Sequence, residues 1–352
     1  MALVPALTLL ASALSSSSAC ESVLQEHERG LSAFLRLVDL YRDGKRDEAV
    51  EGLSHLKPGE ADRLIGGKGQ ALEEDQKASS SAMDHCVRAA SLLETELGMK
   101  WVSQSRWKEA DASFNEAWKL ANALESNASG KQFQRDWLLA AGLFYQGQIA
   151  LQDPGSAFYR ADSCLREAAR KYPDDVEVLL AAGAVLEFSG SLREGLPSDL
   201  REAEKLYARS VQLEKDNAEA NLRLGWVLKK LRKYDEAAVH LHRVLDLSSD
   251  PHHIYRSRMA LGALAETAGR LSEAASHYEA ATRAEPAWQI GYIAWSHALH
   301  AAGSHSRARE ILEKALGTNP AAERLDGWWR YELGLAPRLD SLLERMRAEV
   351  RS

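Results

Sequence analysis

Apolar residues recur along most of the chain at the spacing of an α-helix. Leu224, Leu228 and Leu231 stand four and three residues apart, so they share one face of a helix. A second amphipathic stretch follows each such helix, after a short turn that in two places holds a glycine, Gly269 or Gly303. The pattern predicts an all-α chain built from pairs of helices.

The helix pairs repeat with a period close to 34 residues. Four alanines stand at the same place in successive copies, spaced by 34, 37 and 34 residues: Ala203, Ala237, Ala274 and Ala308. A glycine occupies the middle of three of the preceding helices: Gly183, Gly225 and Gly262. Small residues at these places let two helices approach closely, and stacking of neighbouring pairs buries the apolar faces that one pair leaves open.

The stretch AEANLRLGWVLKKLRKYDEAAVHLHRVLDL, which starts at Ala218, resembles the tetratricopeptide repeat, a helix–turn–helix unit of about 34 residues. Asn221 stands where tryptophan is most common in that family. The resemblance implies an all-α, right-handed superhelical solenoid of about six stacked repeats, with helical caps at both ends. It also implies a concave groove in which such proteins bind a peptide or a partner helix.

The sequence divides into four parts, and the first, residues 1–20, is the expected export signal described below. The array is expected over residues 91–322, after a divergent N-terminal helical cap at residues 21–90. Residues 323–352 are expected to form C-terminal capping helices. Trp328, Trp329 and Leu333 are expected to cover the last repeat, because a terminal unit must hide its neighbour's apolar surface.

Residues 1–20 have the pattern of an export signal. The apolar run from Ala2 to Leu14 carries no charge, is too short to span a bilayer, and is followed by small residues that end at Cys20. This end resembles a bacterial lipoprotein cleavage site, although the basic start and a leucine three residues before the cysteine are missing. We therefore expect a periplasmic or membrane-anchored protein with Cys20 as the lipidation site. The alternatives are a disordered or misassigned start and a cytoplasmic protein.

Composition and motifs argue against catalysis and against binding to nucleic acid. The formal net charge of −7 disfavours a whole-chain grip on nucleic acid. The three cysteines form no Cys-x-x-Cys pair, and GGKGQ at residues 66–70 lacks the Lys-Ser/Thr end of a phosphate-binding loop. His240 and His242 would point about 200° apart on a helix, so they cannot readily share one ion. We expect no enzyme activity, no metal and no cofactor.

A candidate binding surface lies on the helix predicted from Ala218. The family resemblance implies that the positions around Trp226 face the groove. Five residues share that face at helical spacing: Leu222, Arg223, Trp226, Lys229 and Lys230. Arg256 of the next repeat is expected to approach them. An aromatic anchor surrounded by cations is typical of a protein-binding patch. The alternative is a solvated helix face with a partly packed tryptophan.

The expected function is that of a non-catalytic protein-interaction scaffold. It would bind a protein or peptide partner in the concave groove, in a bacterial envelope assembly. One alternative is a cytoplasmic regulatory module that joins an enzyme or a sensor. An enzyme hidden in residues 21–90 is disfavoured, because that stretch is short and helical.

Overall fold

The computed structural model describes six stretches of the chain: residues 29–56, 77–124, 127–149, 154–192, 197–317 and 339–351. Within them the chain is helical, joined by turns and short loops, and none of these residues forms a strand. The predicted all-α class is therefore confirmed. The described residues form two compact units, which we call unit 1 and unit 2. Unit 1 contains the residues up to Phe144 and the C-terminal helix, and unit 2 runs from Tyr145 to Gly317.

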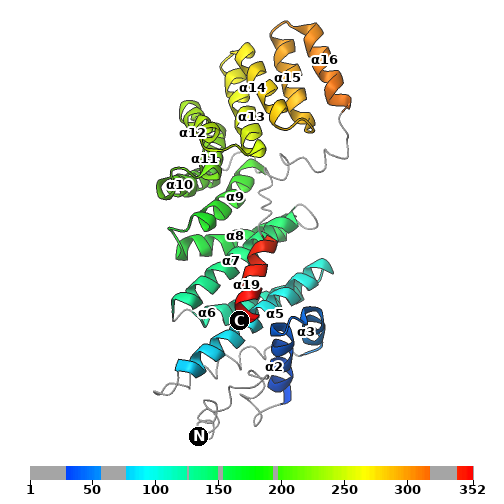
Figure 1. Ribbon diagram of the computed structural model, residues 1–352, viewed down its shortest axis with the longest axis vertical. Coiled ribbons are helices and arrows are strands. Elements are labelled where there is room, and N and C mark those ends of the chain that lie inside the picture. The colour runs from blue at the N-terminus through cyan, green and yellow to red at the C-terminus, as the bar shows by residue number, and fades with distance from the viewer. Residues whose placement is uncertain are drawn as a thin grey trace. The chain divides into compact units, whose positions relative to one another are not determined.

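Unit 2 is a stack of helix pairs. It contains α8 (Pro154–Lys171), α9 (Val176–Leu192), α10 (Pro197–Leu213), α11 (Ala218–Lys230), α12 (Tyr234–Leu247), α13 (Pro251–Thr267), α14 (Leu271–Ala284), α15 (Gln289–Ala301) and α16 (His305–Gly317). Each of α9, α11, α13 and α15 packs against the helix that follows it (Figure 1). Neighbouring pairs also contact each other, through α10 with α11, α12 with α13, and α14 with α15. The predicted series of stacked pairs is confirmed in this part of the chain.

Close approach of the two helices in a pair explains the small residues of the repeat. A Cβ added at Gly183 would lie 2.4 Å from the ring of Tyr207, and one at Gly262 would lie 2.4 Å from the ring of Tyr278. Ala237 and Ala274 are each fully buried. A larger side chain at these positions would force the two helices apart. The packing therefore explains why small residues recur at these places of the repeat.

Five of the helix pairs turn between their helices through a left-handed residue that lies five positions before the repeat alanine. Five residues in such turns have positive φ angles of 58° to 82°: Gly44, Ser105, Arg232, Gly269 and Gly303. Arg232 and Ser105 adopt this conformation without being glycine, at a conformational cost. The shared geometry extends the repeat motif to two helix pairs of unit 1, whose second helices contain Ala49 and Ala110.

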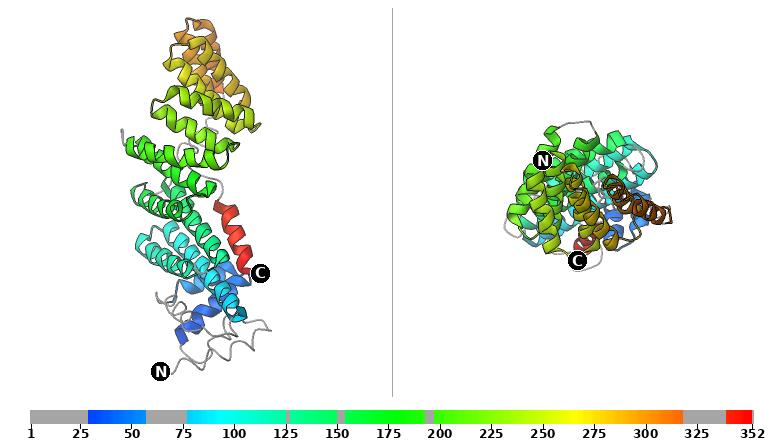
Figure 2. Two further views of the ribbon diagram at one scale, coloured as in Figure 1. Left: turned by 90° about the vertical axis from the view of Figure 1, so that its left-hand side faces the viewer. Right: turned by 90° about the horizontal axis from the view of Figure 1, so that it is seen from above.

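Unit 1 joins the beginning and the end of the sequence. It contains α2 (Arg29–Arg42), α3 (Arg46–Leu53), α5 (Lys77–Ser103), α6 (Trp107–Asn122), most of α7 (Ala128–Ile149), and α19 (Leu339–Arg351). The C-terminal helix α19, drawn in red, lies beside α5 and α2 in both side views (Figures 1 and 2). The expected covering of the last repeat by Trp328, Trp329 and Leu333 falls outside the described residues, as does residue range 1–20.

Among the described helices, none combines the length and the apolar character that a bilayer crossing requires.

Candidate partner-binding surface

The predicted surface is built on α11, whose start is fixed by a side-chain cap. The Asn217 side chain accepts a hydrogen bond of 2.9 Å from the backbone N–H of Ala220, as N-cap residues do. Leu222, Arg223, Trp226, Lys229 and Lys230 all lie on this helix. The sixth predicted residue, Arg256, lies on α13, and α13 packs directly against α11. We call the side of α9, α11, α13 and α15 that carries these positions the first-helix face.

The six predicted residues differ sharply in exposure. Leu222 is fully buried, and Trp226 retains only 4% of its surface, within an apolar cluster that includes Leu261 and Leu264. Lys229, Lys230 and Arg256 are only partly buried, in contrast to these apolar residues. The Lys229 ammonium lies 4.2 Å from the centre of the Trp226 ring, which is a cation–π contact. Arg223, in contrast, is only 8% exposed. The surface therefore presents Lys229, Lys230 and Arg256 in part to solvent and holds the aromatic ring beneath Lys229.

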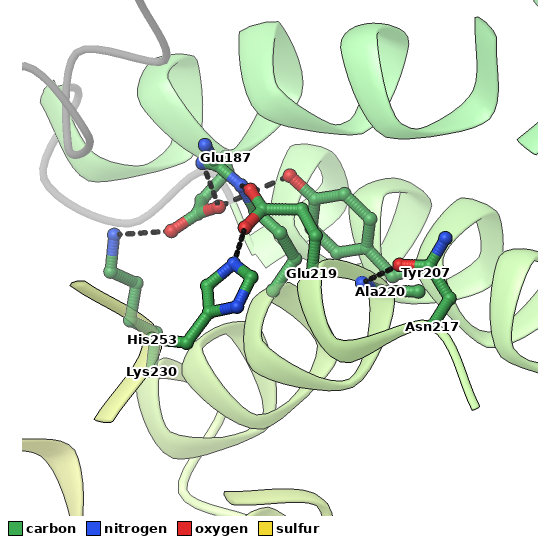
Figure 3. Close-up of polar contacts among 8 residues, drawn as sticks. Glu187, Tyr207, Asn217, Glu219, Ala220, Lys230 and His253 are labelled. Atoms are coloured by element: carbon green, nitrogen blue, oxygen red, sulfur yellow. Dashed lines mark hydrogen bonds and ion pairs between the residues drawn. The ribbon is translucent and has the colours of Figure 1, made fainter. Parts of the chain in front are cut away.

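A buried glutamate on the neighbouring helix α9 organises these cations. Glu187, which is 3% exposed, accepts a hydrogen bond of 3.1 Å from the Tyr207 hydroxyl. Its carboxylate also lies 3.4 Å from the Arg223 guanidinium. The Lys230 ammonium lies 3.2 Å from the same carboxylate (Figure 3). A buried charge is tolerated when it is paired and hydrogen-bonded in this way. Glu187 thus fixes α10 and α11 to α9 through one carboxylate.

A second carboxylate, Glu219, connects α11 to α13. It receives a hydrogen bond of 2.9 Å from Arg223 and lies 3.3 Å from the His253 ring, whose other nitrogen is 2.9 Å from the Ser248 hydroxyl. Burial acts to raise the pKa of Glu219, but Arg223, His253 and Arg256 outweigh that effect and lower the pKa to about 2. Glu219 is therefore an anion at neutral pH. Figure 3 shows its contact with His253.

Glu187, Glu219 and His253 are part of this surface but were not among the residues predicted from the sequence. The Glu219–Arg223 pair has the i,i+4 spacing of a helical ion pair, so the sequence did contain a signal for it. Glu187 stands 36 residues before Arg223, and only the stacking of repeats brings the two together. An acidic partner that approaches this surface must therefore compete with carboxylates of the chain itself.

The last helix pair leaves the corresponding positions open. Ile293 and His297 on α15 occupy the repeat positions of Leu222 and Trp226. Ile293 is 46% exposed, and the exposed ring of His297 lies 3.0 Å from Glu266 on α13. Glu266 also accepts a hydrogen bond of 2.7 Å from Tyr278. Apolar surface on the first-helix face is thus available at α15 and not at α11.

Groups with potential reactivity elsewhere in the described residues have ordinary structural explanations. Cys164 lies on α8, and burial raises the pKa of its thiol to about 12, which disfavours a nucleophilic thiolate. Two histidine rings, His300 and His305, approach each other to 3.3 Å at the turn between α15 and α16. Within the described part of the chain, no three His, Cys, Asp or Glu side chains are grouped closely enough to hold a metal ion.

Comparison with known proteins gives a local sequence match and a set of structural likenesses. The family model described as tetratricopeptide repeat matches residues 219–250, which lie on α11, α12 and the loop after them. A search of curated proteins found no match to this chain. A crystal structure of MamA shares 22% identity, covers 49% of this chain and 94% of its own, and has a TM-score of 0.40. MamA from Desulfovibrio magneticus RS-1, from residue 41 to its end, shares 20% identity, covers 55% of this chain and 97% of its own, and has a TM-score of 0.41.

Proposed function

We propose that this chain, which is a tetratricopeptide-repeat protein, is a non-catalytic scaffold that binds a peptide or a partner helix along the first-helix face of unit 2. Repeat arrays of this kind are protein-interaction scaffolds, because their stacked helices present an extended surface. The finer elements of the proposal are the face, the chemistry of the partner and the envelope setting.

The observation that carries the proposal is the arrangement of Lys229 over Trp226. Lys229 is half-buried, and its ammonium rests against the ring at 4.2 Å. A carboxylate of a partner could attract this ammonium away from the ring and uncover the aromatic surface below it. Arg223 and Lys230 are held in place by Glu187, so they would position the site while Lys229 moves. The partner that fits is a segment with an acidic group beside an apolar side chain.

Ile293 adds an apolar contact point for the same partner on the last helix pair. It occupies the repeat position of Leu222 and is 46% exposed. A peptide that follows the first-helix face from α11 to α15 would meet cations first and then Ile293. This order predicts an acidic end and an apolar end in the bound segment.

Substitution of Lys229 tests the proposal, because Trp226→Ala would disturb the core as well as the surface. Partner capture from solubilised cells would be compared for immobilised wild-type chain, Lys229→Glu and the control Lys314→Glu. Lys314 is an exposed lysine on α16 in the same unit. We expect Lys229→Glu to weaken capture at least about tenfold, which corresponds to about 1.4 kcal/mol. Equal capture by all three chains, with unchanged circular dichroism, would place the binding surface elsewhere.

The envelope setting remains part of the proposal and is supported by the sequence of residues 1–20 alone. An exported chain should lose about 19 or 20 residues from its start, as mass spectrometry of the native protein would show. If Cys20 carries the lipid, Cys20→Ser should release the chain from membranes. Recovery of the intact start in a cytosolic fraction would contradict export.

A further inference from the structure

The C-terminal helix α19 has the pattern of a helical ligand. Its sequence, LDSLLERMRAEVR, places five side chains on one buried face: Leu342, Leu343, Met346, Arg347 and Val350. The exposed fractions of the four apolar side chains range from 0% to 4%, and that of Arg347 is 6%. Apart from Leu339 and Ala348, the remaining positions carry charged or small polar residues, and most are exposed. This pattern is the one by which amphipathic helices bind in grooves of other proteins.

The groove that receives α19 contains a buried carboxylate that binds an arginine. Glu96 on α5 is 4% exposed, and it accepts a hydrogen bond of 2.6 Å from Tyr41 on α2 and a contact from Arg46 on α3. Arg347 of α19 donates to the same carboxylate at 2.8 Å. We call Tyr41, Arg46 and Glu96 the Glu96 socket. Because Tyr41 and Arg46 belong to the groove, the carboxylate keeps two partners when Arg347 leaves.

Two further polar contacts fix the register of α19. Arg345 lies 3.2 Å from the buried carboxylate of Asp136 on α7, and Arg42 on α2 donates to the backbone carbonyl of Val350 at 3.4 Å. Together with the Glu96 socket, they contact α19 from three different helices of unit 1. The groove is therefore specific for an arginine at the position of Arg347, directly after the buried Met346.

The docking of α19 is not imposed by its connection to the chain. In unit 2, each helix of a pair is joined to its neighbour by a short turn, so the two cannot separate far. Arg347 and Glu96, in contrast, are 251 residues apart in the sequence. The chain between Gly317 and Leu339 is 21 residues long and lies outside the described residues. Release of α19 would leave all sequence-adjacent contacts of unit 1 in place.

We propose that the groove formed by α2, α3, α5 and α7 is a second interaction surface, specific for an amphipathic helix of the pattern Leu-Leu-x-x-Met-Arg-x-x-Val, and that α19 occupies it as a displaceable internal ligand. A partner helix with this pattern binds unit 1 only when α19 leaves. The inference concerns unit 1, so it is independent of the function proposed for unit 2.

A full-length chain in which α19 is expelled from its groove provides the test. Met346→Asp would place a carboxylate at a fully buried position of α19 and change no residue of the groove. Ala348→Asp places the same group on the exposed side of the same helix and is the matched control. The probe is a fluorescein-labelled peptide of residues 338–352, RLDSLLERMRAEVRS, and its binding would be followed by fluorescence anisotropy.

We expect the peptide to bind the Met346→Asp chain at least about tenfold more tightly than wild type or Ala348→Asp, because a tethered ligand competes at an effective concentration on the order of millimolar. The peptide with Arg347→Ala should bind the Met346→Asp chain at least about tenfold more weakly, whereas the peptide with Arg351→Ala should bind normally. Arg351 lies on the exposed side of α19.

Three results would overturn the proposal. Loss of the helical circular-dichroism signal in the Met346→Asp chain would show that α19 is an integral part of unit 1. A folded Met346→Asp chain that does not bind the peptide would show that the groove does not accept a helix in trans. A wild-type chain that is dimeric at micromolar concentration, and becomes monomeric with Met346→Asp, would show that α19 docks on a second copy.

Hydrogen exchange of the wild-type chain gives a second measurement that requires no substitution. A displaceable helix opens without unfolding of the rest of the unit, so its amides exchange by a low-energy local process. We expect amides of α19 to exchange at least about tenfold faster than buried amides at the centre of α5. Equal protection of the two helices would mean that they open only together, and the proposal would be wrong.

Discussion

Glu96 in unit 1 and Glu187 in unit 2 are buried carboxylates with the same set of partners, which is one tyrosine and two cations. Glu96 contacts Tyr41, Arg46 and Arg347, and Glu187 contacts Tyr207, Arg223 and Lys230. The tyrosine bond is 2.6 Å at Glu96 and 3.1 Å at Glu187. The two carboxylates thus have the same kinds of partner, but the cations come from different parts of the chain.

The difference lies in how each cation reaches its carboxylate. Arg223 and Lys230 belong to α11, the first helix of the next repeat, at 36 and 43 residues from Glu187. Stacking of repeats alone therefore completes the Glu187 group. Arg347 comes from the C-terminal helix, 251 residues from Glu96, and its position depends on the docking of α19. A buried charge can thus be compensated by the repeat itself or by a distant segment, and only the second can be removed without unfolding a repeat.

A third buried glutamate, Glu94, shows the effect of a different environment. It lies on α5 two residues before Glu96 and is 8% exposed. Burial and then the nearby carboxylate of Glu116 raise its pKa to about 8, against a smaller opposing effect of a hydrogen bond from Ser113. Glu94 therefore holds a proton near neutral pH. Glu96 differs from it in lying against two arginines, Arg46 and Arg347.

Replacement of Glu94 should produce the largest effect. In the unfolded chain its pKa is near 4.5, so between pH 4.5 and 8 the folded state holds a proton that the unfolded state has released. Stability must fall as the pH rises through this window, because the unfolded state binds fewer protons. Glu94→Gln removes the free-energy cost of ionising this buried carboxyl group, because glutamine does not ionise. We expect it to raise the free energy of unfolding at pH 9 by about 3–5 kcal/mol relative to its effect at pH 5.

Urea unfolding followed by circular dichroism at pH 5, 7 and 9 would measure this difference. Glu109→Gln is the control, because its carboxylate is exposed and its pKa is lowered, mainly by a hydrogen bond from Arg106. The control should run parallel to wild type between pH 5 and 9. If the Glu94→Gln curve is also parallel to wild type, the carboxyl group of Glu94 is not held in its neutral form.

Removal of one arginine from the Glu96 group and one from the Glu187 group should distinguish compensation by a distant segment from compensation by the next repeat. Arg347→Met leaves Glu96 paired with Arg46 but also loosens α19, whose apolar face is buried in unit 1, so we expect it to destabilise α5 by about 3 kcal/mol. Arg223→Met leaves Glu187 paired with Lys230, and α11 stays in place through its packing with α10 and α12. We expect a smaller loss there, about 1–2 kcal/mol.

Native-state hydrogen exchange can measure both losses in the same molecule, at amides of α5 and of α11. Each substitution serves as the control for the other, because the two groups lie in different units. Equal losses at the two sites would mean that the distant origin of Arg347 has no energetic consequence, and the comparison drawn above would fail.

The repeat was predictable from the sequence because its packing is local. Gly225 and Ala237 stand at fixed spacing, and the close contact between Gly225 and Leu241 is set within one pair of helices. The same spacing gave the helix pairs of unit 2, and it placed Leu222 to Lys230 on one face of α11. The sequence also indicated that Arg256 would lie near that face, since it occupies the next repeat.

Two features could not be predicted, because they depend on contacts between distant segments. Nothing in the spacing around Arg347 indicates that α19 packs against α2 and α5. The burial of Trp226 was also not evident, since an aromatic residue on a groove-facing position can be exposed or covered. Exposure at such a position depends on the neighbouring pairs, as Ile293 shows by remaining 46% exposed at the position equivalent to Leu222.

The smallest expected difference concerns the two tyrosines. Tyr41→Phe removes a hydrogen bond of 2.6 Å to Glu96, and Tyr207→Phe removes one of 3.1 Å to Glu187. A hydrogen bond to a charged group contributes about 1.5–3 kcal/mol, and shorter, better aligned bonds lie at the upper end. Burial, and then Glu96, raise the pKa of Tyr41, so its hydroxyl stays a donor throughout the accessible pH range.

We therefore expect Tyr41→Phe to lower the local free energy of unfolding by about 2 kcal/mol and Tyr207→Phe by about 1.5 kcal/mol. Tyr278→Phe sharpens the test within unit 2, because Tyr278 donates to Glu266 at 2.7 Å, and Glu266 is paired with the exposed ring of His297. If bond length decides the loss, Tyr278→Phe should resemble Tyr41→Phe. If the burial of the carboxylate decides it, the loss at Tyr278 should be the smallest of the three, because Glu266 is more exposed than Glu96 and Glu187. A larger loss at Tyr207 than at Tyr41 would contradict the bond-length explanation, because Glu96 and Glu187 are about equally buried.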